Sequence, residues 1–238
     1  MVYFALNQPG RLEELLEQVC PDVIVSALRG DFDKQLAVHR GAADFLKRRG
    51  GRMIFLSTAN VFDGSTDSVH YETDPMNSVS VYGKYKIACE KLLTEHMSDQ
   101  LAILRLPFVW GRNSPRFLQV HNGCREGYLE VYEGLKSNHT TDLQVAEYTE
   151  WIIEQEKSGI YHVGTSEVVL YSDFIRRMIC QLGWQMPEFQ KTEAPETMAV
   201  LTLREDLPGY LKWTTSDLLE YLAGKNWRQE GRRFGCRT

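Results

Sequence analysis

Three short apolar runs, separated by segments with helical spacing, constrain the fold of this chain most strongly. Each run is nearly continuous in apolar residues, as is typical of strands buried on both faces of a parallel sheet. They read DVIVSAL, RMIFLS and LAILRL, at residues 22–28, 52–57 and 101–106. Apolar residues at helical spacing mark residues 11–19, 33–50 and 81–97. This alternation predicts an α/β fold, a parallel sheet with helices on both faces.

The second half of the sequence is less regular and predicts a smaller α+β lobe. Helices are expected at residues 141–159, 170–183 and 216–224, with a short strand at 160–164. Ser172 is the expected N-cap of the second of these helices, and Gly183 its stop. We therefore predict one domain over residues 1–111 and a smaller C-terminal lobe over 112–238 whose elements interleave with the sheet.

Composition excludes several classes of function. The net charge of −5 argues against nucleic acid as the main partner, and the basic stretch RQEGRRFGCR is interpreted as a solvated end. No apolar run reaches the ~18 residues of a membrane span. The six histidines and five cysteines are dispersed, so no metal site is expected. The odd cysteine count fits reduced thiols, and a cytoplasmic protein is expected.

Polar residues at the predicted strand ends indicate where a site would lie. Ligands of parallel sheets bind outside the carboxyl ends of the strands, so residues 26–28, 57–58 and 107–108 should line one crevice. Tyr82 and Lys86 share a face of the helix that follows. An ammonium beside a phenol lowers its pKa and makes it a usable general acid. The alternative is that the pair is only the solvated face of an amphipathic helix, and that Thr58 merely caps its strand.

Four motifs together resemble a known family. They read STANVFDG, YETDP, YGKYKIACE and LAILRLPFVWG. In this combination they are similar to the extended short-chain dehydrogenase/reductases and, among these, to the dTDP-4-dehydrorhamnose reductases, whose first motif reads S-T-D-x-V-F-D-G. The resemblance covers residues 12–112 and extends more faintly to 183. It implies a Rossmann-like NAD(P)-binding domain, N-terminally truncated, followed by a substrate-binding lobe.

The resemblance also implies site residues and an activity, the NAD(P)-dependent reduction of a 4-keto nucleotide sugar. The implied catalytic residues are Thr58, Tyr82 and Lys86. The implied contacts of the cofactor, NADP or NAD, are Ala27, Leu28, Leu56, Tyr82, Lys86 and Pro107. The implied substrate contacts are Thr58, Val61 and Arg112. Tyr82 would give a proton to the developing alkoxide, Lys86 would lower its pKa and bind the ribose, and Thr58 would polarise the carbonyl.

The chain departs from the family pattern at its start. The family's glycine-rich turn, G-x-x-G-x-x-G, which holds the pyrophosphate, occurs nowhere in the sequence. By the resemblance, about one βαβ unit of ~30 residues is absent, which would leave the strand at 22–28 with an open edge. Ala59 stands where the family has an acidic residue. The family's helix asparagine has no clear counterpart, although His39 is near that position.

Several interpretations stay open at this point. The chain is expected to be a fragment or a mis-started reading of a full enzyme; the rivals are a natural truncation and an edge covered by another chain, either a second copy or a partner. The first alternative function is a non-catalytic subunit resembling the regulatory subunit of methionine adenosyltransferase. The second is a nucleotide-sugar epimerase or dehydratase. The sequence does not distinguish NAD from NADP, or one sugar from another.

Overall fold

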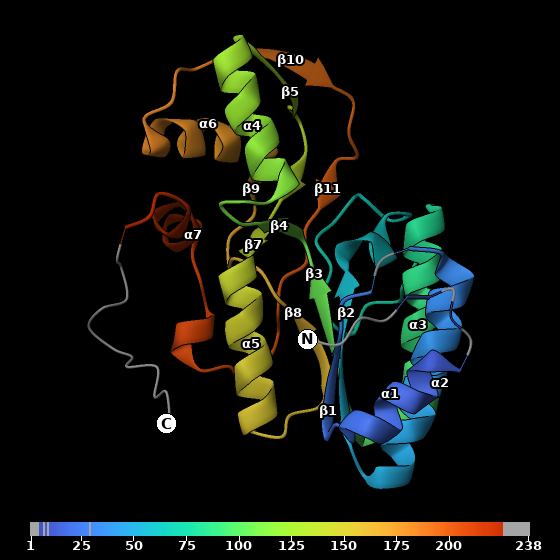
Figure 1. The fold of residues 1–238 in the computed structure, drawn as a ribbon. Coiled ribbons are helices and arrows are strands. Elements are labelled where there is room, and N and C mark those ends of the chain that lie inside the picture. Colours follow the sequence, from blue (N-terminus) through green and yellow to red (C-terminus); the bar gives the residue numbers. More distant parts are fainter. Residues whose placement is uncertain (1–4, 7, 9, 29, 226–238) are drawn as a thin grey trace.

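The structure is a computed structural model and describes residues 5–6, 8, 10–28 and 30–225 (Figure 1). The basic stretch RQEGRRFGCR and its Cys236 lie outside the described residues. Within those residues, no helix combines the length and the apolar character needed to cross a membrane.

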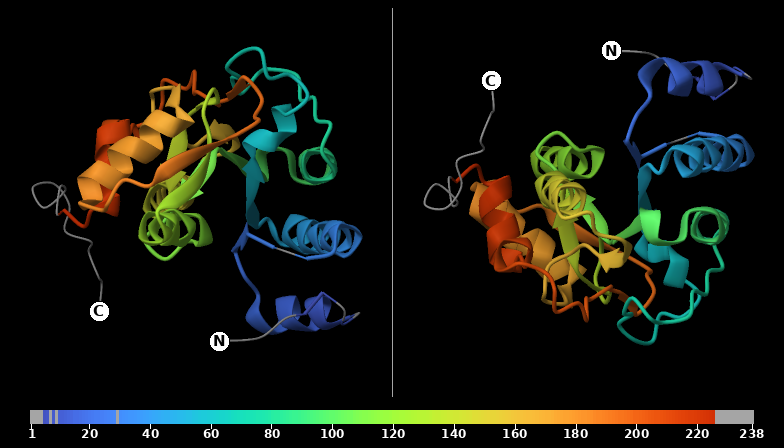
Figure 2. Two further views of the ribbon diagram at one scale, coloured as in Figure 1. Left: turned by 90° about the horizontal axis from the view of Figure 1, so that it is seen from above. Right: turned by 90° about the horizontal axis from the view of Figure 1, so that it is seen from below.

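A four-stranded parallel sheet with helices on both faces forms the larger part of the molecule, as predicted (Figure 1). Its strands, in spatial order, are β1 (Val23–Ser26), β2 (Arg52–Thr58), β3 (Leu101–Leu106) and β8 (Gly159–His162). Helices α1 (Arg11–Val19), α2 (Phe32–Arg49) and α3 (Val81–Met97) cover one face, and α5 (Asp142–Glu154) covers the other (Figure 2). Among the described residues, β1 and β8 are the two edge strands of this sheet, and Val25 of β1 is partly exposed.

Alternating side chains of β2 explain why both faces are covered. Met53 and Phe55 pack in the apolar cluster formed with α2 and α3, whereas Ile54 packs in the cluster formed with α5. Because successive side chains of a strand point to opposite faces, an uninterrupted apolar run requires cover on both sides. Asp31 caps α2 by accepting a hydrogen bond from the Lys34 amide, and Gly50 ends it with a positive φ of 71°.

The C-terminal lobe lies beside the main sheet in Figures 1 and 2 and packs around its own apolar core. Its helices are α4 (Pro115–Glu126), α6 (Tyr171–Leu182) and α7 (Thr215–Leu222). Its strands pair as β5 (Tyr128–Tyr132) with β10 (Glu188–Thr192), β4 (Phe108–Trp110) with β7 (His139–Thr141), and β6 (Lys136–Ser137) with both β9 (Val169–Leu170) and β11 (Thr197–Met198). Although α5 and β8 follow residue 112, they are part of the larger domain: β8 is a strand of the main sheet, and α5 covers one of its faces.

Two local details differ from the sequence analysis. The expectation that Ser172 caps α6 is wrong, because β9 runs directly into the helix and Leu170 precedes its first residue. The Ser172 hydroxyl instead donates to the Glu133 carbonyl at 3.1 Å. Helix α4 was not predicted, although Ser114 followed by Pro115 is a helix-start signal that the structure uses.

Two buried histidines should make the fold acid-sensitive. Burial lowers the pKa of His139 to about 3 and that of His162 to about 4. His162 is also influenced by Glu72, which raises its pKa, and by Arg105, which lowers it. The unfolded chain therefore binds more protons below pH 6.5, so stability falls as pH falls. From pH 7 to pH 5 we expect a loss of about 4 kcal/mol from the two groups together, and His39, whose pKa burial lowers to about 4, adds about 2 kcal/mol more.

Urea unfolding at pH 7, 6 and 5 would measure this loss. His162→Asn should show a shallower decline than the wild-type protein. A free energy of unfolding that stayed constant over this range would show that neither histidine is held neutral.

Candidate active site at the carboxyl ends of the parallel strands

The carboxyl ends of the strands lie along one edge of the sheet, as predicted. Ser26 ends β1, and Thr58 ends β2 opposite Leu106 of β3. Pro107 therefore follows immediately beside Thr58. Ser26 and Thr58 are both buried.

Helix α3 brings Tyr82 and Lys86 together beside these strand ends. Ser80 caps the helix by accepting a hydrogen bond from the Gly83 amide at 3.0 Å. Tyr82 is 42% exposed, whereas Lys86 is only 5% exposed. The Lys86 Nζ lies 5.9 Å from the centroid of the Tyr82 ring. Because the lysine is buried, the pair is not a solvated helix face.

The Lys86 ammonium is held by contacts from β2. Its Nζ donates to the Leu56 carbonyl at 2.7 Å and lies 4.5 Å from the centroid of the Phe55 ring. Burial lowers the pKa of Lys86, an effect that Cys89 and Glu90 oppose. These contacts hold the Lys86 side chain beside the Tyr82 ring, which lies on the same face of α3.

Tyr85 is a supporting residue. Its hydroxyl donates to the Gln35 Oε1 at 2.9 Å, and its ring stacks on Phe32 with centroids 4.4 Å apart. Burial raises the pKa of Tyr85. Phe32 also lies 6.2 Å from the Tyr82 ring, so the stacked pair forms one side of the surroundings of Tyr82.

Thr58 does more than end its strand. Its hydroxyl accepts from the Asn60 amide nitrogen at 3.2 Å and donates to the Asn60 Oδ1 at 2.9 Å. It thereby caps the short 3₁₀ helix η1 (Ala59–Phe62). To donate to a ligand carbonyl, the hydroxyl would have to exchange the Asn60 oxygen for that carbonyl.

Gly83 makes the close approach of α3 to η1 sterically allowed, which gives a testable prediction. A β-carbon at Gly83 would overlap the Ser78 hydroxyl and the Asn60 carbonyl oxygen. We expect Gly83→Ala to destabilise the protein by about 1–3 kcal/mol, because overpacking forces backbone shifts. The matched control is Gly134→Ala, where a β-carbon meets nothing within 4 Å. Denaturant unfolding of both variants would test this; equal stabilities would contradict it.

A buried ion pair, which the sequence analysis missed, lies beneath the strand ends. Arg105 of β3 donates to the Glu90 Oε2 of α3 at 2.8 Å, and both side chains are 2% exposed. Ser57 donates to the other Glu90 oxygen at 2.5 Å. The only sequence signal was that Glu90 follows Lys86 by one helical turn. The pair joins α3 to β2 and β3 and so supports the helix that carries Tyr82.

The remaining residues implied by the resemblance fall into two groups. Ala27 is exposed and Leu28 half-buried just after β1, and Leu56 and Pro107 lie near Lys86 and Thr58 respectively. Val61, however, is completely buried in an apolar cluster with Phe62.

Arg112 contacts helix α7. Its guanidinium donates twice to the Tyr221 carbonyl, at 3.1 and 2.7 Å, and lies over the Tyr221 ring. It is thus engaged with the end of α7.

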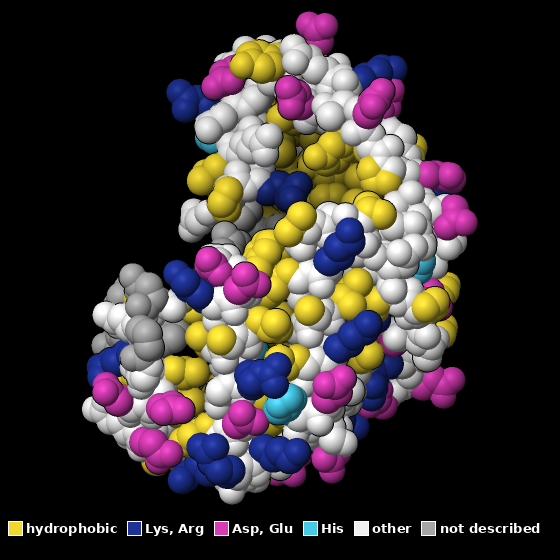
Figure 3. All heavy atoms as spheres, turned by 90° about the vertical axis from the view of Figure 1, so that its right-hand side faces the viewer, with side chains coloured by type: hydrophobic (Ala, Val, Ile, Leu, Met, Phe, Trp, Pro, Cys, Tyr) yellow, Lys and Arg dark blue, Asp and Glu magenta, His cyan; other side chains and the backbone are white. Residues whose placement is uncertain are grey.

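Arg116, which the sequence analysis did not single out, lines a hollow in the C-terminal lobe. Its guanidinium carbon lies 4.8 Å from the ring centroid of Phe108 and 5.7 Å from that of Trp110. The hollow has a volume of about 70 Å³ and is also lined by Tyr132 and Tyr171. Figure 3 shows that the upper part of one face is hollowed, with many hydrophobic side chains in the depression.

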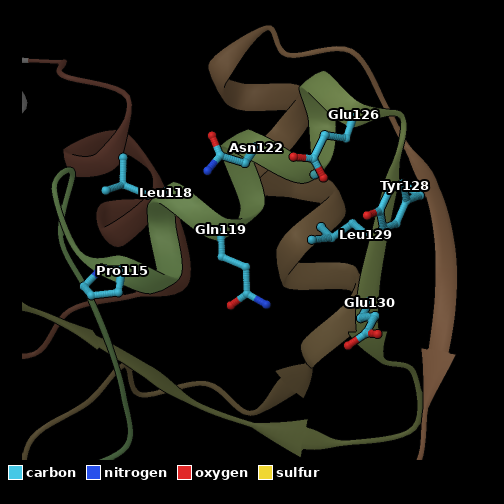
Figure 4. Close-up of a pocket in the computed structure, with 9 residues that line it drawn as sticks. Pro115, Leu118, Gln119, Asn122, Glu126, Tyr128, Leu129 and Glu130 are labelled. Carbon is cyan, nitrogen blue, oxygen red and sulfur yellow. The ribbon is translucent and has the colours of Figure 1, made fainter.

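A second, larger pocket of about 400 Å³ lies between α4 and β5 (Figure 4). Leu118, Gln119 and Glu126 come from the helix, and Tyr128 and Glu130 from the strand. None of the residues that line it lies at the carboxyl ends of β1, β2 or β3.

Parallel strands with covering helices, together with Thr58, Tyr82 and Lys86 at the strand ends, define a Rossmann-like chain of the extended short-chain dehydrogenase/reductase class. Residues 34–220 match the family described as the RmlD substrate binding domain. Because this match covers most of the sequence, the chain belongs to that family.

Two of the curated proteins that this chain resembles are named dTDP-4-dehydrorhamnose reductase. A dTDP-4-dehydrorhamnose reductase of Burkholderia thailandensis is 32% identical over 126 residues, which is 48% of this chain and 42% of that protein. The Shigella flexneri dTDP-4-dehydrorhamnose reductase is 30% identical over 123 residues, 47% of this chain and 41% of that protein. The chain thus spans about half the length of the curated relatives it matches.

Solved structures support the fold. The dTDP-4-dehydrorhamnose reductase of Yersinia enterocolitica superposes with a TM-score of 0.79 at 18% identity, covering 92% of this chain and 86% of that one. The Bacillus anthracis dTDP-4-dehydrorhamnose reductase, solved in complex with NADP, gives a TM-score of 0.78 at 15% identity with the same coverage. At these identities the likeness shows the fold alone.

Proposed function

We propose that this chain carries the site of an NAD(P)-dependent reductase that acts on a 4-keto nucleotide sugar, as dTDP-4-dehydrorhamnose reductases do. The observation that carries the proposal is the half-exposed Tyr82 phenol beside the buried Lys86 ammonium, next to Thr58 at the end of β2. The names of the curated relatives, among them a dTDP-4-dehydrorhamnose reductase, point to the same substrate class.

Each residue would have a separate task in the reduction. A bound nicotinamide would supply the hydride. Tyr82 donates a proton to the oxygen of the former ketone, and Lys86 makes this phenol acidic enough to act near neutral pH. Thr58 donates a hydrogen bond to the same oxygen after releasing Asn60. Ala27, Leu28, Leu56 and Pro107 would contact the cofactor, NADP or NAD.

The two lobes would divide the binding work. We assign cofactor binding to residues 1–111 and sugar-nucleotide binding to the C-terminal lobe. Arg116, with its aromatic neighbours Tyr132 and Tyr171, fits a phosphate-bearing ligand better than Arg112, whose donors are engaged with Tyr221. The residues at the strand ends, together with Tyr82 and Lys86, fit the nicotinamide end of a dinucleotide. The given sequence contains no glycine-rich turn that would hold the pyrophosphate.

The test is NADPH oxidation by the wild-type chain in the presence of dTDP-4-dehydrorhamnose, together with NADPH binding measured by calorimetry. Oxidation that depends on the keto sugar would support the proposal. Failure to bind either NADPH or NADH would contradict it. Retention of NAD with no net NADPH consumption would instead favour an epimerase on the same fold.

A non-catalytic binding subunit is the second candidate. One observation favours it: β1 lies at an edge of the described sheet and leaves Val25 partly exposed there. A partner chain or a second copy would then pair with β1. Light scattering would detect the homodimer. A stable complex with a larger enzyme, formed by a chain that binds no dinucleotide, would support this candidate over the first.

A further inference from the structure

A buried histidine joins three elements of the main domain and has no role in the chemistry proposed above. His39 of α2 is 2% exposed. Its Nε2 lies 2.7 Å from the Ser26 hydroxyl at the end of β1, and its Nδ1 lies 3.7 Å from the Cys89 sulfur on α3. Both ring nitrogens therefore have partners, one on each neighbouring element.

The same ring is linked to Lys86 through β2. The His39 ring meets the Phe55 ring edge-on, with centroids 5.1 Å apart and an interplanar angle of 86°. The Lys86 Nζ lies 4.5 Å from the centroid of that Phe55 ring. Cys89, the second partner of His39, follows Lys86 by about one helical turn. Because a helical turn is rigid, a contact that fixes Cys89 also restricts Lys86.

The charge state of His39 suits this position. Burial, and secondly the positive charge of Lys86, lower the pKa of His39 to about 4. A hydrogen bond to the Gln35 backbone, within the same helix, opposes this shift. At neutral pH the ring is therefore uncharged, with one donor and one acceptor nitrogen. It adds no second positive charge beside the Lys86 ammonium.

We propose that His39 is a positioning residue, which ties the α3 turn that carries Lys86 to the carboxyl end of β1. Ser26, its partner there, directly precedes Ala27 and Leu28. The contact thus sets the spacing between the lysine and the β1 end, the two walls that would hold the nicotinamide end of the cofactor. The role in cofactor binding rests on the proposed reductase function. The spacing between Lys86 and the end of β1 does not depend on it.

The test compares His39→Leu with His39→Gln, which keeps a hydrogen-bonding side chain, and uses His121→Leu in the other lobe as the control. The first readout is the NADPH dissociation constant. We expect His39→Leu to raise it about tenfold or more, because small misplacements in a binding site are costly, and His39→Gln to raise it less. The control should leave it unchanged.

The second readout needs no cofactor. The Lys86 side-chain NMR signals, assigned by comparison with Lys86→Met, would be titrated with pH. In His39→Leu the pKa of Lys86 should rise toward its usual value as the turn loosens and water reaches the ammonium. If the wild-type chain binds no dinucleotide, the proposed function fails and this titration alone decides the positioning role. If the pKa of Lys86 in folded His39→Leu equals its value in the wild-type protein, the positioning role of His39 is excluded.

Discussion

Tyr82→Phe is expected to lower kcat/KM for keto-sugar reduction by about 10² to 10⁴-fold, the usual contribution of a positioned general acid. The substitution removes the proton that would neutralise the alkoxide but keeps the ring. The ring lies near Phe32 and 5.9 Å from the Lys86 Nζ, so the packing of α3 should persist. The affinity for NADPH should change much less than kcat.

Tyr85→Phe is the matched control for this prediction. It makes the same chemical change three residues further along the same helix, where the hydroxyl donates to Gln35. We expect it to leave kcat nearly unchanged. Steady-state kinetics of both variants, with circular dichroism to confirm folding, would measure the difference. Equal activity of Tyr82→Phe and the wild-type enzyme would exclude Tyr82 as the proton donor.

The largest effect on stability is expected from Arg105→Met, which should destabilise the protein by about 3–5 kcal/mol. The substitution leaves the Glu90 carboxylate buried with only Ser57 as its side-chain partner on β2. Because a buried charge without a counter-ion loses hydration and gains little in return, the cost comes mainly from Glu90. The double variant Arg105→Met with Glu90→Leu should recover much of the stability.

The chain offers an exposed ion pair for comparison. Lys136 and Glu196 are 3.0 Å apart with side chains 52% and 61% exposed. Lys136→Met should change the free energy of unfolding by no more than about 1 kcal/mol, because solvent screens such pairs. Urea unfolding of the three variants would test the prediction. A double variant less stable than Arg105→Met alone would show that Glu90 is not the source of the cost.

Local sequence patterns predicted the main helices and strands, because the formation of each element depends mostly on residues close together in the sequence. The run LAILRL became β3, and the helical spacing of residues 81–97 became α3 with the same bounds. The spacing of Tyr82 and Lys86 placed them on one face for the same reason. Helix α4 was missed, although Ser114 and Pro115 mark its start, because its apolar spacing is weak.

The other site residues depend on contacts between segments far apart in the sequence. Arg105 and Glu90 meet only because β3 packs against α3, and Arg112 is drawn to Tyr221 only because α7 returns beside it. Val61 is apolar and therefore buried with Val200, a residue near the other end of the chain. A pattern within one segment cannot reveal such pairings.

The sequence by itself determined the alternation of strands and helices, the polar residues at the strand ends, and a tyrosine and lysine on one helical face. These follow from side-chain periodicity and capping, which act within a few residues. Only the tertiary structure decided that Lys86 is buried, that Glu90 pairs with Arg105, and that Arg116 rather than Arg112 lines a hollow. Burial and ion pairing are set by the packing of distant segments, and the physical chemistry of the site follows from that packing.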